Sequence, residues 1–112
     1  MIKNVLYIFI TVFISTNLLA QASHNVTVAN FSFTPSSLTI EVGDTVFWTN
    51  TSGTHNVNGS MTTFPSNPDS FGSGAPSSGW TYSYVFTMAG DYTYRCDPHA
   101  GGGMTATILV SE

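Results

Sequence analysis

The chain has 112 residues, which is enough for one domain and too few for two hydrophobic cores of ordinary size. Charged residues make up only 7% of it, and two Lys and Arg residues stand against six Asp and Glu residues. This sparse, acidic composition argues against a protein that binds nucleic acid or an anionic membrane surface, because both ligands require a cationic face. The single cysteine excludes a disulfide within the chain, so any special role for it must be chemical.

The N-terminal segment is typical of a secretory signal peptide. An apolar run that is shorter than the roughly 20 residues needed to span a bilayer ends in small residues. Ala20 and Ala22 form an Ala-x-Ala cleavage site, and cleavage after Ala20 is also open. A permanent signal anchor is the alternative. We expect a signal peptide over residues 1–22 and one domain over residues 23–112. The mature chain would then be periplasmic or extracellular, without membrane insertion.

From residue 23 onward, apolar residues alternate with polar ones, which is the period of half-buried β-strands. Turn signals such as Gly43-Asp44 separate the alternating runs, and no stretch of useful length has helical spacing. The sequence therefore predicts an all-β protein, an antiparallel β-sandwich with Greek-key connections. The expected strands contain the alternating positions 26–28, 38–42, 46–48, 82–86 and 92–96, with a short strand at 55–57 and a closing strand at 105–110.

The segment 59–79 interrupts this rhythm. It is rich in Ser, Gly and Pro, and its prolines prevent a continuous strand. A loop of this length inside a compact domain is unusual unless it is functional or held down by packing. We expect Phe64 and Phe71 to pin it to the sandwich.

Side chains that can bind a metal gather near the C-terminus. Cys96, His99 and Met104 lie within nine residues, between two predicted strands. The glycines at 101–103 permit positive φ, so the chain can curl and bring the thioether back toward the same point. A second imidazole is available at His55, at the end of the predicted strand before Val57.

Two imidazoles, one thiolate and a weak axial thioether are the ligand set of a blue-copper electron-transfer site. Zinc would prefer a carboxylate or a further thiolate to a thioether, so the residues favour one copper ion. Each residue also has an ordinary alternative role. Cys96 could be a buried apolar filler, Met104 could be core packing, and His55 and His99 could be loop or surface histidines.

These motifs resemble the cupredoxins, specifically the small plastocyanin and pseudoazurin type. The stretch Gly-Asp-Tyr-Thr-Tyr-Arg-Cys-Asp-Pro-His at 90–99, followed by Met104, matches the Cys-x-x-His-x-x-x-x-Met ligand loop of that type. The resemblance covers the whole mature chain, and the long segment 59–79 departs from it. Further matching features are Phe33-x-Pro35, the turn at 43–46, Trp48, Asn50, His55-Asn56 and the Phe-Gly-Ser-Gly segment at 71–74.

The resemblance implies that His55, Cys96, His99 and Met104 bind copper. It also implies that Asn56 forms hydrogen bonds near the thiolate loop and braces it. We expect the His99 imidazole to be the ligand nearest the solvent, surrounded by small uncharged residues of its loop.

The resulting functional prediction is a small, soluble, monomeric electron carrier that cycles between Cu(I) and Cu(II). Its partners would be larger redox proteins such as a c-type cytochrome, an oxidase or a reductase, and it would not be an enzyme. A copper carrier or chaperone is the alternative, although a buried four-ligand site releases copper slowly. An enzyme with Cys96 as nucleophile is disfavoured, because no third group is placed to orient the histidine and Met104 would be idle.

Overall fold

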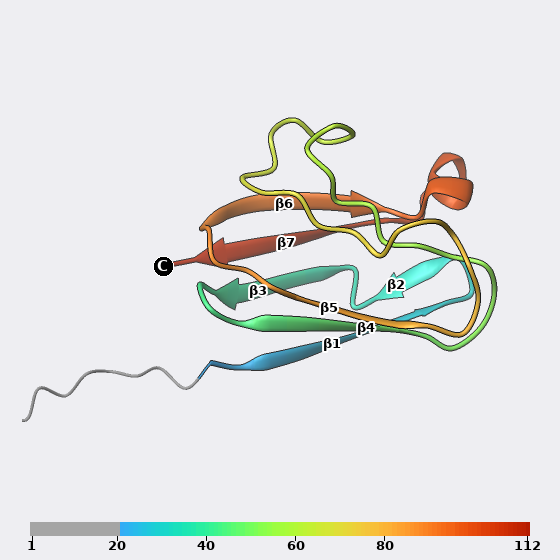
Figure 1. Ribbon diagram of the computed structural model, residues 1–112, viewed down its shortest axis with the longest axis horizontal. Coiled ribbons are helices and arrows are strands. Elements are labelled where there is room, and N and C mark those ends of the chain that lie inside the picture. Colours follow the sequence, from blue (N-terminus) through green and yellow to red (C-terminus); the bar gives the residue numbers. More distant parts are fainter. Residues whose placement is uncertain (1–20) are drawn as a thin grey trace, which may run out of the picture.

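The computed structural model describes residues 21–112, which fold into two packed β-sheets (Figure 1). The predicted signal peptide therefore lies almost entirely outside the described residues. No helix within residues 21–112 is long and apolar enough to cross a membrane. The first sheet has the order β2-β1-β4-β5, with β1 Ser23–Ala29, β2 Ser32–Thr34, β4 Thr45–Asn50 and β5 Thr81–Val85. The second has the order β3-β7-β6, with β3 Ser37–Glu41, β6 Gly90–Arg95 and β7 Thr105–Ser111.

Alternating apolar residues form the core between the sheets, as the sequence predicted. Trp48 of β4 is fully buried and stacks on Tyr82 with ring centroids 5.3 Å apart, whereas Phe47 beside it points outward and is 41% exposed. One expected core position is wrong: Val42 follows the end of β3 and is exposed. The fully buried aliphatic residues of the core include Val26, Val28, Ile40, Val46, Val57, Ile108 and Val110.

The predicted β-sandwich is confirmed, but its pairing is mixed and the expectation of purely antiparallel strands is wrong. β1 runs parallel to β4, and β3 runs parallel to β7, while the other three strand pairs are antiparallel. After β2 the chain crosses to the second sheet as β3 and returns as β4 in the direction of β1. Alternation specifies which face a residue occupies and carries no information on the neighbouring strand, so it could not reveal these crossovers.

The loop between β4 and β5 covers the outer side of β6 (Figure 1). Phe71 is 5% exposed and packs on Trp48, which confirms that it pins the loop, while Phe64 is only half-buried. Asn67, which the sequence did not single out, is 3% exposed. Its side-chain amide donates to the Thr93 carbonyl, and its side-chain oxygen accepts the Thr93 N–H, both at 2.9 Å.

Candidate metal centre

The predicted metal-binding segment lies at the end of the sandwich opposite the C-terminus (Figure 1). Cys96 follows β6 directly, and the chain then forms a short 3-10 helix, η1 Asp97–Gly102, before β7. The sequence predicted that this piece must curl and did not predict a helix. Gly103 ends η1 with φ of +93°, so one of the three consecutive glycines uses the positive φ that each of them permits.

Backbone hydrogen bonds hold the segment in a tight loop. The Cys96 N–H donates to the Met104 carbonyl at 3.0 Å, and the Met104 N–H donates to the His99 carbonyl at 3.3 Å. The His99 N–H in turn donates to the Cys96 carbonyl at 3.1 Å. These three bonds bring residues that are up to eight positions apart into direct contact, as the sequence analysis required.

Three candidate ligand atoms converge at this point. The Cys96 Sγ lies 3.4 Å from the His99 Nδ1 and 3.7 Å from the His55 Nδ1, and the two Nδ1 atoms are 3.1 Å apart. Metal–sulfur and metal–nitrogen bonds of about 2.0–2.3 Å place neighbouring ligand atoms about 3–4 Å from one another. The cluster therefore has the spacing of a site for one metal ion, and its donors are those of a copper site.

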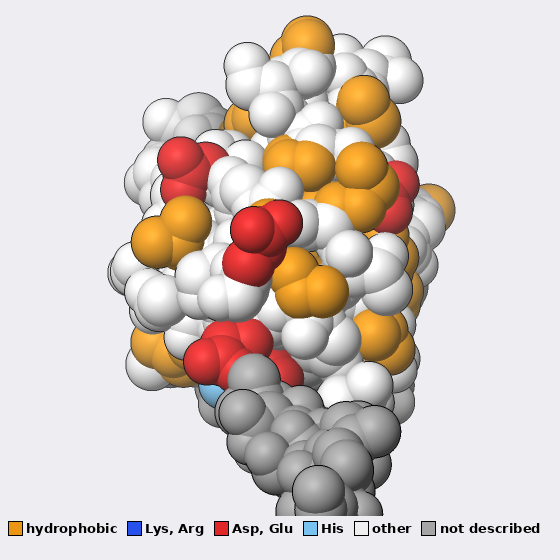
Figure 2. All heavy atoms as spheres, turned by 90° about the vertical axis from the view of Figure 1, so that its left-hand side faces the viewer, with side chains coloured by type: hydrophobic (Ala, Val, Ile, Leu, Met, Phe, Trp, Pro, Cys, Tyr) orange, Lys and Arg blue, Asp and Glu red, His pale blue; other side chains and the backbone are white. Residues whose placement is uncertain are grey.

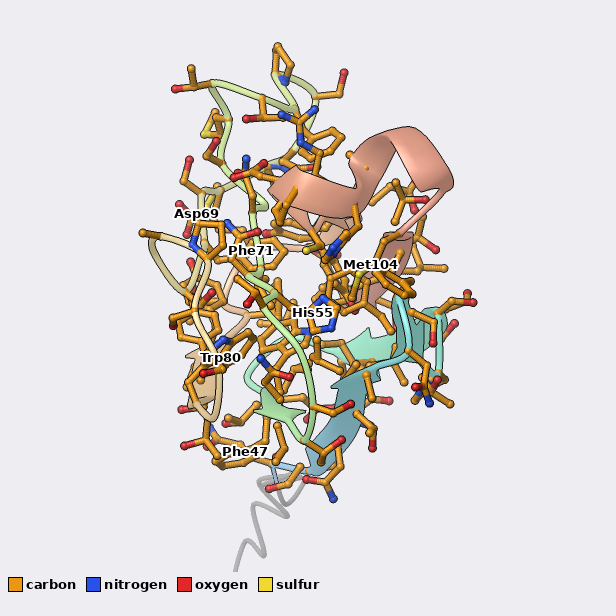
Figure 3. All side chains as sticks on the ribbon, turned by 90° about the vertical axis from the view of Figure 1, so that its right-hand side faces the viewer. Phe47, His55, Asp69, Phe71, Trp80 and Met104 are labelled. Atoms are coloured by element: carbon orange, nitrogen blue, oxygen red, sulfur yellow. The ribbon has the colours of Figure 1, made fainter. Side chains whose placement is uncertain are left out.

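Met104 is buried close to this cluster. It is 1% exposed, and Figure 3 shows its side chain with that of His55 in the middle of this end of the molecule, beneath η1. Thioether sulfur is a soft donor that suits Cu(I). The structure thus brings three candidate ligand atoms together, and the backbone hydrogen bond between Cys96 and Met104 places the fourth residue next to them.

His55 does not lie in a strand, although the sequence suggested one there. Its backbone N–H and carbonyl pair with Ser77 in an isolated bridge, with both hydrogen bonds at 3.1 Å. The buried Asn50 side chain donates to the carbonyls of Ser77 and Gly53, and so fixes the segments on both sides of the imidazole. A Cβ at Gly53, where φ is +89°, would lie 2.7 Å from the His55 Nε2, so a glycine is required for this ring position.

The Asp97 carboxylate forms a second support for the ligand loop. It accepts hydrogen bonds from the side chains of Asn56, Asn58 and Arg95 at 2.8–3.0 Å. The predicted bracing role of Asn56 fits this arrangement, because its side-chain oxygen also accepts the Asp97 backbone N–H. The hydrogen bond from Asn58, followed by that from Asn56 and by Arg95, holds the pKa of Asp97 below its usual value.

Burial shifts the pKa values of two further groups of the site toward the neutral form. It raises the pKa of the Cys96 thiol, and it lowers the pKa of His55, with the nearby His99 lowering it further. A metal ion that binds the thiolate must therefore displace a proton.

His99 is the one candidate ligand with substantial exposure. It is half-buried, whereas His55, Cys96 and Met104 are at most 2% exposed. This confirms the prediction that His99 is the candidate ligand nearest the solvent. The sequence analysis missed Phe31, whose ring lies edge-on to His99 with centroids 4.7 Å apart. Its signal in the sequence is faint: an Asn-Phe pair stands where a hairpin turn commonly has Asn-Gly.

Residues 20–111 match the sequence family described as copper-binding proteins, plastocyanin/azurin family. The chain is 41% identical over 83 residues to plastocyanin of Scenedesmus fuscus, and the match covers 70% of this chain and 85% of that one. It is also 41% identical over 85 residues to the chloroplastic plastocyanin of Chlamydomonas reinhardtii, where the match covers 70% of this chain but only 57% of that protein.

Solved structures with a similar fold include an oxidized amicyanin variant, with a TM-score of 0.65 and 28% sequence identity. That match covers 79% of this chain and 81% of the amicyanin chain. A copper-containing nitrite reductase from Thermus scotoductus superposes with a TM-score of 0.68 and 28% identity. That match covers 80% of this chain and 22% of the reductase. The fold of this chain thus occurs both alone and as one part of a larger protein.

Proposed function

The chain belongs to the plastocyanin/azurin family of copper-binding proteins, and we propose that it carries single electrons between larger redox proteins. We assign His55, Cys96, His99 and Met104 as the ligands of one copper ion. The observation that carries the proposal is the convergence of a buried cysteine sulfur and two imidazole nitrogens within 4.8 Å of one another. A buried site with one partly exposed ligand suits electron exchange without release of the metal.

Copper in this ligand set supplies a one-electron Cu(I)/Cu(II) couple. The protein's own contribution is to hold the ligands in place and to exclude water. The bonds of Asn50 around His55, and those of Asp97 at the start of η1, fix the two halves of the site from different parts of the chain. A site that is held in this way rearranges little when its charge changes, and this favours fast electron exchange.

The distribution of charge favours docking at the His99 end. Acidic side chains gather at the opposite end of the sandwich, where Figure 2 shows several of them and no Lys or Arg (Glu41, Asp44, Asp91 and Glu112 lie at this end). Near the metal site, the charges of Asp97 and Arg95 pair at 2.9 Å. The surface around His99 is therefore nearly uncharged, which suits short-lived contact with a redox protein such as a c-type cytochrome, an oxidase or a reductase.

We further propose that the domain is exported after removal of the N-terminal segment, as its sequence suggests. Ala22 forms two hydrogen bonds with the folded domain: its N–H donates to the Asp44 carboxylate, and its carbonyl accepts the Thr45 N–H. Cleavage after Ala20 would keep both bonds, whereas cleavage after Ala22 would remove them. We therefore favour Gln21 as the first residue of the exported chain, which mass spectrometry of the secreted protein would identify.

A copper chaperone remains the second candidate function, because it would use the same metal. The burial of Cys96 and His55 argues against it, since a chaperone needs ligands that an acceptor protein can reach. For the same reason we propose no enzymatic role for the Cys96 thiol. A slow rate of copper transfer to a chelator, set against a fast rate of electron exchange, would distinguish the carrier from the chaperone.

The test is to load the protein with copper and to record absorption and voltammetry. In the absorption spectrum we expect a strong band at about 600 nm, from charge transfer between the thiolate and Cu(II). In voltammetry we expect a reversible one-electron wave. The Cys96→Ser variant should lose the band. A colourless wild-type complex, or a serine variant that keeps the colour, would refute the assignment of the thiolate.

A further inference from the structure

The turn between β1 and β2 contains an unfavourable residue. Ala29 lies opposite Ser32, so Asn30 and Phe31 form a two-residue turn, and their φ angles are +51° and +55°. A hairpin turn with two positive φ values prefers Asn-Gly. Asn30 suits the first position, but Phe31 stands where glycine is strongly preferred, since a bulky residue with positive φ is strained.

Burial does not compensate for this strain. Phe31 is 68% exposed, the largest value among the exposed large apolar residues of the described chain. Its ring instead lies beside the metal site, edge-on to His99 at 4.7 Å and edge-on to His55 at 6.1 Å between centroids, with interplanar angles of 87°. It forms one wall of an open groove that leads to both imidazoles.

The two imidazoles differ in how they are held. His55 is enclosed, and the Gly53 backbone lies directly against its Nε2. The His99 ring is half-buried, and within residues 21–112 its hydrogen bonds run through Nδ1 toward the site. The Phe31 ring is a further contact of the His99 imidazole, besides these hydrogen bonds.

We propose that Phe31 is a positioning residue for His99. Its ring limits rotation of the imidazole, so that Nδ1 stays turned toward the Cys96 sulfur, and it closes part of the groove to water. A residue that is unfavourable for its own turn yet contacts a functional side chain is typical of a functional site. The benefit for electron transfer rests on the proposed function, because a fixed ligand would rearrange less between the two copper states.

Two variants separate the ring from the turn. Phe31→Gly relaxes the backbone and removes the ring, whereas Phe31→Leu keeps the strained backbone and an apolar side chain without the flat ring. Phe47→Leu, at an exposed aromatic residue in β4, is the matched control. The measurement is the NMR spectrum of the His99 ring protons in the Cu(I)-loaded protein, together with the denaturant midpoint of the copper-free protein.

In both Phe31 variants we expect the His99 ring signals to broaden and to lose the shift caused by the neighbouring ring, with no change in the control. We also expect the copper-free midpoint of Phe31→Gly to equal or exceed that of the wild type, because the turn gains its preferred residue. His99 signals that keep their line widths in both variants would overturn the proposal, because a loss of the shift alone shows only that the Phe31 ring is near.

The outcome is separable from that of the proposed function. A protein that failed to bind copper or to cycle one electron would refute the carrier role. The His99 signals of the copper-free protein would still report whether Phe31 restrains the imidazole.

Discussion

Asn56 and Asp97, which are 41 residues apart in the chain, are joined by two hydrogen bonds. The Asn56 side-chain oxygen accepts the Asp97 backbone N–H at 2.8 Å, and its amide donates to the Asp97 carboxylate at 3.0 Å. Asn56 directly follows His55, and Asp97 directly follows Cys96. The pair therefore fastens the two separate segments of the metal site to each other.

Replacing Asn56 by alanine should loosen this connection. We expect Asn56→Ala to lower the free energy of unfolding by about 1–3 kcal/mol, because the Asp97 N–H loses its acceptor. It should also shift the reduction potential. Denaturant unfolding and voltammetry measure the two effects. Asn58→Ala is the control, because Asn58 binds the same carboxylate but not the backbone N–H. Equal shifts of potential in both variants would mean that only the carboxylate matters.

Gly53→Ala should displace the His55 imidazole. The new Cβ would lie 2.7 Å from the Nε2, and φ at this position is +89°. Gly79→Ala is a matched control, since φ there is +66° and no atom lies within 4 Å of the added Cβ. Both variants should lose about 1 kcal/mol of stability from the backbone. Only Gly53→Ala should lower the copper affinity and alter the visible spectrum. An unchanged spectrum would show that the added Cβ is accommodated without displacing the imidazole from the metal.

Met104→Gln tests the assignment of the thioether. A weakly bound thioether would disfavour Cu(II), so an oxygen donor in its place should lower the reduction potential while copper still binds. Met61→Gln is the control, since Met61 is exposed and lies in the loop between β4 and β5. If voltammetry gave the same potential for both variants and the wild type, Met104 would serve only as core packing.

Asp44 should make stability depend on pH at the end remote from the metal. Its carboxylate accepts the N–H groups of Glu41 and Ala22 and pairs with His24, and the bond from Glu41 contributes most to lowering its pKa below 3.8. A lowered pKa stabilises the folded state above about pH 3.8, and this contribution is lost as the pH falls through the folded value. Asp44→Asn should thus be less stable at pH 7, and the difference should shrink in acid. A difference that is constant with pH in denaturant titrations would contradict this account.

Ala100→Glu should interfere with docking without affecting the metal. It adds a charge beside His99, in η1, where the surface is otherwise nearly uncharged. We expect unchanged colour and potential but a lower second-order rate of electron transfer to the physiological partner. Thr39→Glu, in β3 and away from η1, should leave that rate unchanged. Equal rates for the two variants would place the docking surface elsewhere.

The sequence pointed to residues that converge in the structure, because much of the information is local. Cys96, His99 and Met104 are close along the chain, so their spacing alone restricts the loop that connects them. His55 came from the resemblance and from its residue type. Its supports, Gly53 and Asn50, act through contacts that no spacing rule contains.

Phe31 and Asn67 could not be identified from the sequence for a different reason. Phe31 precedes Phe33 at the interval of an alternating strand, and its role appears only once the turn brings it to His99. Asn67 lies in a segment whose composition predicts a loop and nothing more. In each case the relevant neighbour comes from a distant part of the chain, and the local pattern does not identify that neighbour.

The loop over β6 also covers one edge of the second sheet. β6 ends its sheet, and an uncovered edge strand offers free N–H and carbonyl groups to which a second chain can add. The Asn67 side chain forms hydrogen bonds with both the backbone N–H and the carbonyl of Thr93. The Asn58 backbone does the same with the N–H and carbonyl of Arg95. The loop thus acts as a substitute neighbouring strand, which hinders a second chain from adding to the β6 edge.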